Sequence, residues 1–182
     1  MPLPVALAAA LQLLLAATFL VLPLLAQIFG GAAQRAAEAE MARQGLPGGV
    51  LAQHGINFRE KPWELALALA IAAALTALGW LNLTGEGLGR TLSWIAEPVV
   101  LVAVGSVTAS QVFARRYTEA AFRRSADPRV RDIDVRALLG AAVGAFPSWL
   151  RPAVVLRFWL ATLGSVLVIV LLLTPAAGAH FR

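Results

Sequence analysis

Four long apolar runs dominate the chain. They cover about residues 4–29, 65–83, 91–113 and 153–175. The hydrocarbon core of a bilayer is about 30 Å thick, so about 20 helical residues, each rising about 1.5 Å, are enough to cross it. Backbone N–H and C=O groups in lipid must be satisfied within the segment, because no water is present there. Each run is therefore predicted to form a transmembrane helix.

The first run does not have the pattern of a cleaved signal peptide. No basic residue precedes it, since the first charged residue of the chain is Arg35. The run is also longer than the apolar core of roughly 7–15 residues that signal peptides have. We therefore expect an uncleaved helix, in which Pro23 marks the place for a kink.

Two polar segments separate the runs, at about residues 30–64 and 114–152. The first begins with a stretch rich in Ala, Glu and Gln, which favours helix, and the Gly-Leu-Pro sequence at 45–47 is a stop signal. In the second segment no helix breaker precedes Asp127–Pro128. The third helix is therefore expected to continue beyond its apolar run to about Ser125.

An uncharged stretch, residues 137–150, precedes the fourth run. It is too short to cross a bilayer and suits a helix that lies in the interface or re-enters from one side. The chain is thus predicted to be an all-α integral membrane protein with four transmembrane helices and a short amphipathic or re-entrant helix before the fourth. Residues 1–182 are expected to form a single membrane domain.

The composition is typical of a membrane protein, and the positions of the basic residues predict its orientation across the membrane. Hydrophobic residues make up 59% of the chain and charged residues 14%, whereas soluble domains have about 25% charged residues. Lys and Arg gather in the two polar segments, which are therefore predicted to face the cytoplasm, with both termini on the opposite side. This distribution explains the net charge of +5, so nucleic acid is not expected as a partner. Only Lys61 is a lysine, a bias typical of a GC-rich genome, and we expect the cytoplasmic (inner) membrane of a bacterium.

The sequence lacks the residues that most enzymes need. Cysteine is absent, and the two histidines, His54 and His180, are far apart and lie outside the four runs. Metalloprotease, serine-hydrolase, P-loop and dinucleotide-binding motifs are absent as well. No catalytic residue, metal ligand or cofactor is predicted, and the chain is not expected to be an enzyme.

The pair Glu97–Pro98 interrupts the third run. A residue before proline disfavours the α conformation, whereas proline is favoured at the first position of a helix. We therefore interpret Glu97 as a helix cap, about one turn below the outer interface. The alternatives are a proton or cation site facing the interior of the bundle, since intramembrane carboxylates are commonly functional, and contact with a partner protein. The polar neighbours expected at this depth include Arg90, Asn82 and Ser93.

Basic residues cluster just after the third run, and four of them are candidate contacts for anionic lipid at the cytoplasmic leaflet: Arg115, Arg116, Arg123 and Arg124. On a helix that continues from the membrane they would lie near lipid phosphates, where each basic residue contributes about 1 kcal/mol. The alternative is that they only fix the orientation of the chain.

Small residues recur every four positions on three of the runs. They are Ala66, Ala70 and Ala74 on the second run, Gly105 with Ala109 and Ser106 with Ser110 on the third, and Ala161 with Ser165 on the fourth. Such faces let helices approach closely, within the chain's own bundle, against partner subunits or against a second copy. Four tryptophans near the ends of the runs are expected at the level of the lipid headgroups: Trp63, Trp80, Trp94 and Trp149.

These patterns favour an accessory or assembly subunit of a larger membrane complex, because the chain is small, anchored and without catalytic residues. The first alternative is a small homo-oligomeric transporter or channel that uses Glu97 for a proton or a cation. The second is a membrane enzyme that acts on lipid through the Asp- and Arg-rich cytoplasmic loop.

Overall fold

The computed structural model describes residues 1–181, and this part of the chain is all helical, with 82% helix and no strand. Four of its helices are long and apolar enough to cross a membrane, which confirms the four predicted helices and indicates a multi-pass membrane protein. The chain divides into two compact units. Unit 1 comprises Met1–Val21, Ala66–Val112 and Pro152–Arg182, and unit 2 comprises Leu22–Leu65 and Phe113–Arg151. The single membrane domain stays a prediction, because this division reflects contacts within the chain and not its place in a membrane.

Helix α1 (Leu3–Arg43) contains the first apolar run, includes Pro23, and continues well beyond the run, as predicted. It ends in a Schellman motif, in which the N–H of Leu46 donates to the carbonyl of Met41 at 3.0 Å. Gly45 in this motif has a φ of 81°. The stop at the Gly-Leu-Pro sequence is therefore confirmed, since a residue without Cβ adopts this left-handed conformation without strain.

Helix α3 (Pro62–Leu83) contains the second run and packs closely against α1. A Cβ added at Gly79 would lie 3.0 Å from Cγ of Leu13, so the absence of a side chain there allows the two helices to approach. The helix ends at Leu83, and Gly85, which has a φ of 78°, accommodates the turn into the third run.

The third run forms one long helix with a π-helical segment in its middle. Helix α4 (Gly87–Val99) continues directly into η1 (Val100–Val104) and α5 (Gly105–Val112). Pro98 lies inside α4 and not at a helix start, so the interpretation of Glu97 as a helix cap is wrong. Proline is tolerated here because neighbouring helices and a local π adjustment compensate for its missing N–H in membrane-length helices.

The fourth run has the same construction. Helix α9 (Leu150–Trp159) continues into η2 (Leu160–Gly164) and α10 (Ser165–Leu173), and η2 contacts η1. A short helix that the sequence pattern did not predict, α11 (Pro175–His180), follows; the Thr174 hydroxyl caps its start.

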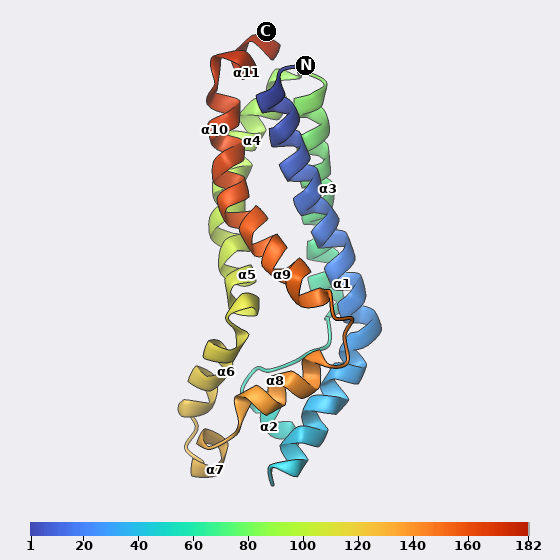
Figure 1. The fold of residues 1–182 in the computed structure, drawn as a ribbon, viewed down its shortest axis with the longest axis vertical. Helices are drawn as coiled ribbons and strands as arrows, with labels where there is room; N and C mark the ends of the chain where they lie inside the picture. The colour runs from blue at the N-terminus through green and yellow to red at the C-terminus, as the bar shows by residue number, and fades with distance from the viewer. Residues whose placement is uncertain (182) are drawn as a thin grey trace. The chain divides into compact units, whose positions relative to one another are not determined.

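In unit 1, helices α1, α3, α4 and α10 lie side by side near the two ends of the chain (Figure 1). The middle of this bundle is an apolar core of Leu, Ala, Val and Phe side chains, including Leu15, Phe19, Leu75 and Leu160. Phe181 packs on a second small cluster that contains Ala8 of α1, so both chain ends lie at the same end of unit 1. An even number of long helices that alternate in direction has this consequence.

Unit 2 holds the rest of α1 and, in the part described, four short helices: α2 (Gly49–Gln53), α6 (Ala114–Arg123), α7 (Pro128–Arg131) and α8 (Val135–Val143). The expected unbroken helix from the third run to Ser125 is wrong in one respect, because a turn at Phe113 separates α5 from α6. Helix α8 is the predicted short helix before the fourth run, and the Asp134 carboxylate caps it. The core of unit 2 includes Met41, Leu51, Phe122 and Leu138.

Candidate functional site

Glu97 lies ten residues into α4, on a helix that can cross a membrane. At about 1.5 Å per residue it is roughly 15 Å from the start of the helix. The depth of one turn below the outer interface stays a prediction, but Glu97 lies well inside its helix and not at the helix start. Only 1% of Glu97 is exposed, so its carboxylate is inside unit 1 and not at a lipid or water surface.

Three uncharged side chains connect to Glu97 through hydrogen bonds. The amide nitrogen of Gln12 donates to Oε1 of Glu97 at 2.9 Å and to Oγ of Ser93 at 3.0 Å. The amide nitrogen of Asn82 donates to Oε1 of Gln12 and to Oγ of Ser93, both at 2.9 Å. We call these four residues, Gln12, Asn82, Ser93 and Glu97, the polar cluster. All four are at most 1% exposed, and they come from α1, α3 and α4.

Local sequence explains how three helices bring these side chains together. Ser93 and Glu97 are four residues apart and therefore share one face of α4. A Cβ added at Gly89 would lie 2.8 Å from the backbone carbon of Leu81, so the start of α4 lies directly against the end of α3. This close approach lets the short side chains of Asn82 and Ser93 meet.

Two further buried oxygens lie at or next to the cluster. Oδ1 of Asn82 accepts no hydrogen bond from the described residues. Ser165, at the start of α10, lies next to the Glu97 carboxylate without a hydrogen bond of standard geometry, and only 1% of it is exposed. Among the residues that the structure describes, no Arg, Lys or His nitrogen lies within 4 Å of this carboxylate. The carboxylate is thus surrounded by neutral polar groups.

Arg90, predicted as a polar neighbour of Glu97, has other partners. Its Nε donates to the carbonyl of Leu172 at 3.0 Å, and its guanidinium lies 4.5 Å from the ring centroid of Trp94 and 5.9 Å from that of Phe181. These contacts join α4 to α10 and to the end of the chain. Trp94 therefore stacks on an arginine within the protein, and it is half-buried.

The structure thus brings together three of the four predicted site residues, Glu97, Asn82 and Ser93, and adds Gln12, which sequence reasoning missed. Gln12 is the first polar residue of α1, in a run that is otherwise almost entirely apolar. A polar side chain in such a run has to find a partner within the bundle, and this was the signal that could have identified it.

A second ionisable residue is buried on the fourth membrane-length helix. Arg157 of α9 is 6% exposed, donates to the side-chain oxygen of Gln111 on α5, and lies over the ring of Phe19, 5.3 Å from its centroid. About 20 Å of helix separates Gln111 from Glu97, so the two buried charges are not partners.

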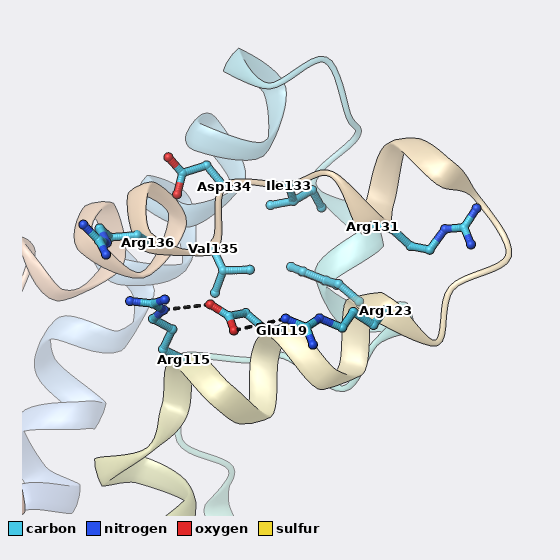
Figure 2. Close-up of a pocket in the computed structure, with 9 residues that line it drawn as sticks. Arg115, Glu119, Arg123, Arg131, Ile133, Asp134, Val135 and Arg136 are labelled. Carbon is cyan, nitrogen blue, oxygen red and sulfur yellow. Dashed lines mark hydrogen bonds and ion pairs between the residues drawn. The ribbon is translucent and has the colours of Figure 1, made fainter.

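Unit 2 contains a pocket of about 420 Å³ on its own surface (Figure 2). It is lined by Arg115, Glu119, Phe122, Arg123, Arg131, Ile133, Asp134, Val135 and Arg136. The Glu119 carboxylate lies 2.7 Å from Nε of Arg115 and 3.8 Å from a terminal nitrogen of Arg123. The hydrogen bond from Arg115 lowers the pKa of Glu119 below its ordinary value.

Two of the four predicted lipid-contacting arginines, Arg115 and Arg123, line this pocket, and the other two, Arg116 and Arg124, do not. The reason is helical geometry: residues 115, 119 and 123 follow one another at four-residue steps along one face of α6, and residues 116 and 124 are turned by about 100° from them.

A scan against protein-family models and searches of curated proteins and of solved structures found no match for this chain. Among residues 1–181, no group of three or more His, Cys, Asp or Glu side chains is placed to hold a metal ion.

Proposed function

We propose that this chain is a small multi-pass membrane protein that binds a proton or a small cation at Glu97 and couples this binding to transport. The observation that carries the proposal is a carboxylate buried inside a membrane-length helix bundle, where its hydrogen-bond partners are neutral. Ionisable residues in such positions usually face the bundle interior and mark ion or proton pathways.

A lone negative charge is unstable in this environment. Removing a carboxylate from water carries a penalty of several kcal/mol, which hydrogen bonds from neutral groups offset only in part. Gln12 supplies a hydrogen bond but no positive charge, and Arg90 is engaged with Leu172 and two aromatic rings. A bound proton or cation is the remaining way to neutralise Glu97, and it is the event that we assign to the site.

The polar cluster can accommodate Glu97 with or without a proton. Without it, Asn82 donates to Gln12 and Gln12 donates to the carboxylate. With it, the Glu97 O–H donates to Oε1 of Gln12, whose amide turns over and donates to Oδ1 of a similarly turned Asn82. The two ends of an amide occupy nearly the same space, so the path from Glu97 through Gln12 to Asn82 fits both arrangements. The Ser93 hydroxyl accepts from both amides in the first arrangement and donates to one of the two amide oxygens in the second. Protonation would therefore reverse the direction of the hydrogen bonds from α4 through α1 to α3.

A small cation is the second occupant that the site suits. The oxygens of Glu97, Ser93 and Asn82 are hard donors of the kind that alkali and alkaline-earth ions prefer. Oδ1 of Asn82, which accepts no hydrogen bond from the described residues, would be a ligand without losing a partner.

Infrared difference spectroscopy and a flux assay test this function together. We expect the purified protein to show the C=O stretch of a protonated carboxyl that changes with pH or on addition of Na⁺, and we expect Glu97→Gln to lose it. In liposomes loaded with a pH-sensitive dye, an acid pulse should cause faster internal acidification with the wild type than with Glu97→Gln.

Glu86→Gln is the matched control. This substitution removes the same charge as Glu97→Gln, but Glu86 is exposed and lies just before α4 begins. This variant should keep both signals. A wild type without a titrating or Na⁺-sensitive carboxyl band, or a Glu97→Gln variant with unchanged flux, contradicts the proposal.

An accessory subunit of a larger complex is the second candidate function, and one observation favours it. The small residues Ala66, Ala70 and Ala74 of α3 are exposed, whereas Gly105 and Ala161 are buried within the chain's own bundle. The α3 face is thus unused inside the protein, and small residues suit close contact with another helix. Purification in mild detergent should then recover a stoichiometric partner, and Ala70→Leu should release it. Recovery of the wild-type chain alone, or a partner that Ala70→Leu does not release, argues for the transporter.

A further inference from the structure

The pocket of unit 2 combines positive charge with an apolar floor. Four of its lining residues are arginines and two are acidic, so the pocket carries a net positive charge (Figure 2). Phe122, Ile133 and Val135 form the apolar part of the lining. The volume of about 420 Å³ lies in the range of roughly 300–1,000 Å³ that small-molecule sites occupy.

The charges inside the pocket are unequally engaged. Asp134 caps α8 by accepting a hydrogen bond from the N–H of Ala137 at 3.0 Å. Glu119 is shared between Arg115, at 2.7 Å, and Arg123, at the longer distance of 3.8 Å. Figure 2 shows Glu119 between these two arginines, with Arg131 and Arg136 on opposite sides of the pocket.

We propose that this pocket binds a phosphate group that carries an alkyl or glycerol substituent, and that the phosphate replaces Glu119 as the partner of Arg115 and Arg123. A guanidinium group is a planar fork that forms paired hydrogen bonds with phosphate oxygens. Once the Glu119 side chain turns away, the donors of Arg115 and Arg123 are open to the phosphate. The side chains of Arg115 and Arg123 are 56% and 76% exposed, so both can reorient without disturbing a core.

The apolar floor accounts for the substituent. Phe122 and Val135 belong to the core of unit 2, are 1% and 5% exposed, and line the pocket next to the arginines with a small area of fixed carbon surface. The carbon substituent of a phosphate ester would contact the part of this surface that is open to the pocket, whereas a bare phosphate would not. Both a phospholipid headgroup and a soluble phosphate ester have this chemistry. The lipid source is within reach of the chain, because Arg115 follows the end of α5 by only three residues.

Two double variants separate a built pocket from general attraction of charge. Arg115→Gln with Arg123→Gln removes the two pocket arginines. Arg116→Gln with Arg124→Gln removes the same charge from the adjacent positions of α6, which do not line the pocket. The probe is phosphatidylglycerol, and its binding to the detergent-purified full chain is counted by native mass spectrometry and compared with phosphatidylcholine. Glycerol 3-phosphate in a calorimetric titration is the soluble arm.

We expect the pocket pair to weaken phosphate binding about thirtyfold, and the control pair by less than about threefold. Arg115→Lys with Arg123→Lys, which keeps the charge but loses the planar fork, should be intermediate and guards against a loss explained by misfolding. Glu119→Gln should strengthen binding several-fold, because Gln does not hold the arginines by charge.

Each outcome decides the matter. Preference for phosphatidylglycerol alone identifies the lipid as the source of the phosphate, and binding of glycerol 3-phosphate identifies the soluble ester. Equal weakening by the two Gln pairs, no effect of Glu119→Gln, or no binding of either probe overturns the proposal.

Discussion

Replacing Gln12 by Leu removes the side chain that connects the three helices of the polar cluster. The variant keeps the volume of the side chain approximately and removes both polar ends. Three hydrogen bonds are lost: the two that Gln12 donates, to Ser93 and Glu97, and the one that it accepts from Asn82. The partners stay buried at 0–1% exposure, so water does not replace the bonds.

The expected magnitude follows from these bonds. Side-chain hydrogen bonds between membrane helices average about 0.6 kcal/mol and reach about 1.7 kcal/mol. A bond to a charged group is worth about 1.5–3 kcal/mol where the site excludes water. Gln12→Leu should therefore lower the free energy of unfolding by about 2–4 kcal/mol. Thr18→Val on the same helix is the control. Among the described residues, the Thr18 hydroxyl donates only to the carbonyl of Leu15 within α1, so this variant should cost less than about 1 kcal/mol.

A double-mutant cycle isolates the contact with Glu97. Unfolding of Gln12→Leu, Glu97→Leu and the double variant is followed by circular dichroism in detergent as sodium dodecyl sulfate is added. We expect a coupling energy of about 1–2 kcal/mol, since directly bonded residues couple by about 0.5–3 kcal/mol. A coupling below about 0.3 kcal/mol refutes the cluster as described, because two side chains joined at 2.9 Å cannot act independently.

Three further predictions concern topology, a turn and pH. Topology reporters should read cytoplasmic at two sites and non-cytoplasmic at a third: Gly48, Asp127 and the end after Arg182, respectively; a cytoplasmic C-terminus contradicts the topology. Gly85→Ala should lower the melting temperature more than Gly45→Ala. Both glycines have a positive φ, but only at Gly85 would an added Cβ lie close to a backbone atom, 3.0 Å from the carbonyl oxygen of His180. Equal decreases in melting temperature would contradict this contact. Arg115 lowers the pKa of Glu119, so their ion pair is fully formed above the ordinary carboxyl pKa and is lost as the pH falls through the lowered pKa. In a side-chain NMR titration, the titration midpoint of Glu119 should be higher in Arg115→Gln than in the wild type.

The sequence was sufficient to predict the elements that depend on local rules. Apolar length predicted all four membrane-length helices, and the Gly-Leu-Pro sequence at 45–47 predicted the end of α1. Both rules act within one segment: hydrocarbon thickness sets the length, and the left-handed conformation at Gly45 sets the stop. Neither requires knowledge of what the segment packs against.

Glu97–Pro98 was misread because a local rule was overridden by packing. The preference of proline for a helix start is worth little against one buried face that continues through α4, η1 and α5, with Ser93, Val100 and Thr108 among its residues. In such a bundle the third run keeps its helix through the proline, and the change appears instead as the π segment directly after it.

The polar cluster depended on contacts that no local pattern encodes. Gln12 is separated from Ser93 by 81 residues and from Glu97 by 85. Depth arguments placed Asn82, Ser93 and Glu97 at the same level, but the level of Gln12 on another helix follows only from how α1 packs on α3. The contact of Gly79 with Leu13 sets this packing, and a glycine in an apolar run is too common to reveal it.

The two buried ionisable residues occupy equivalent places on their helices. Glu97 lies three residues before η1, and Arg157 lies three residues before η2. The two π segments contact each other, so the places where both helices depart from regular α hydrogen bonding coincide in the bundle. A π segment is where a helix bends or shifts most easily, and such segments are frequent at functional sites. In the proposed transporter, a change of charge at Glu97 would therefore act next to η1 and η2, where the two helices bend most easily.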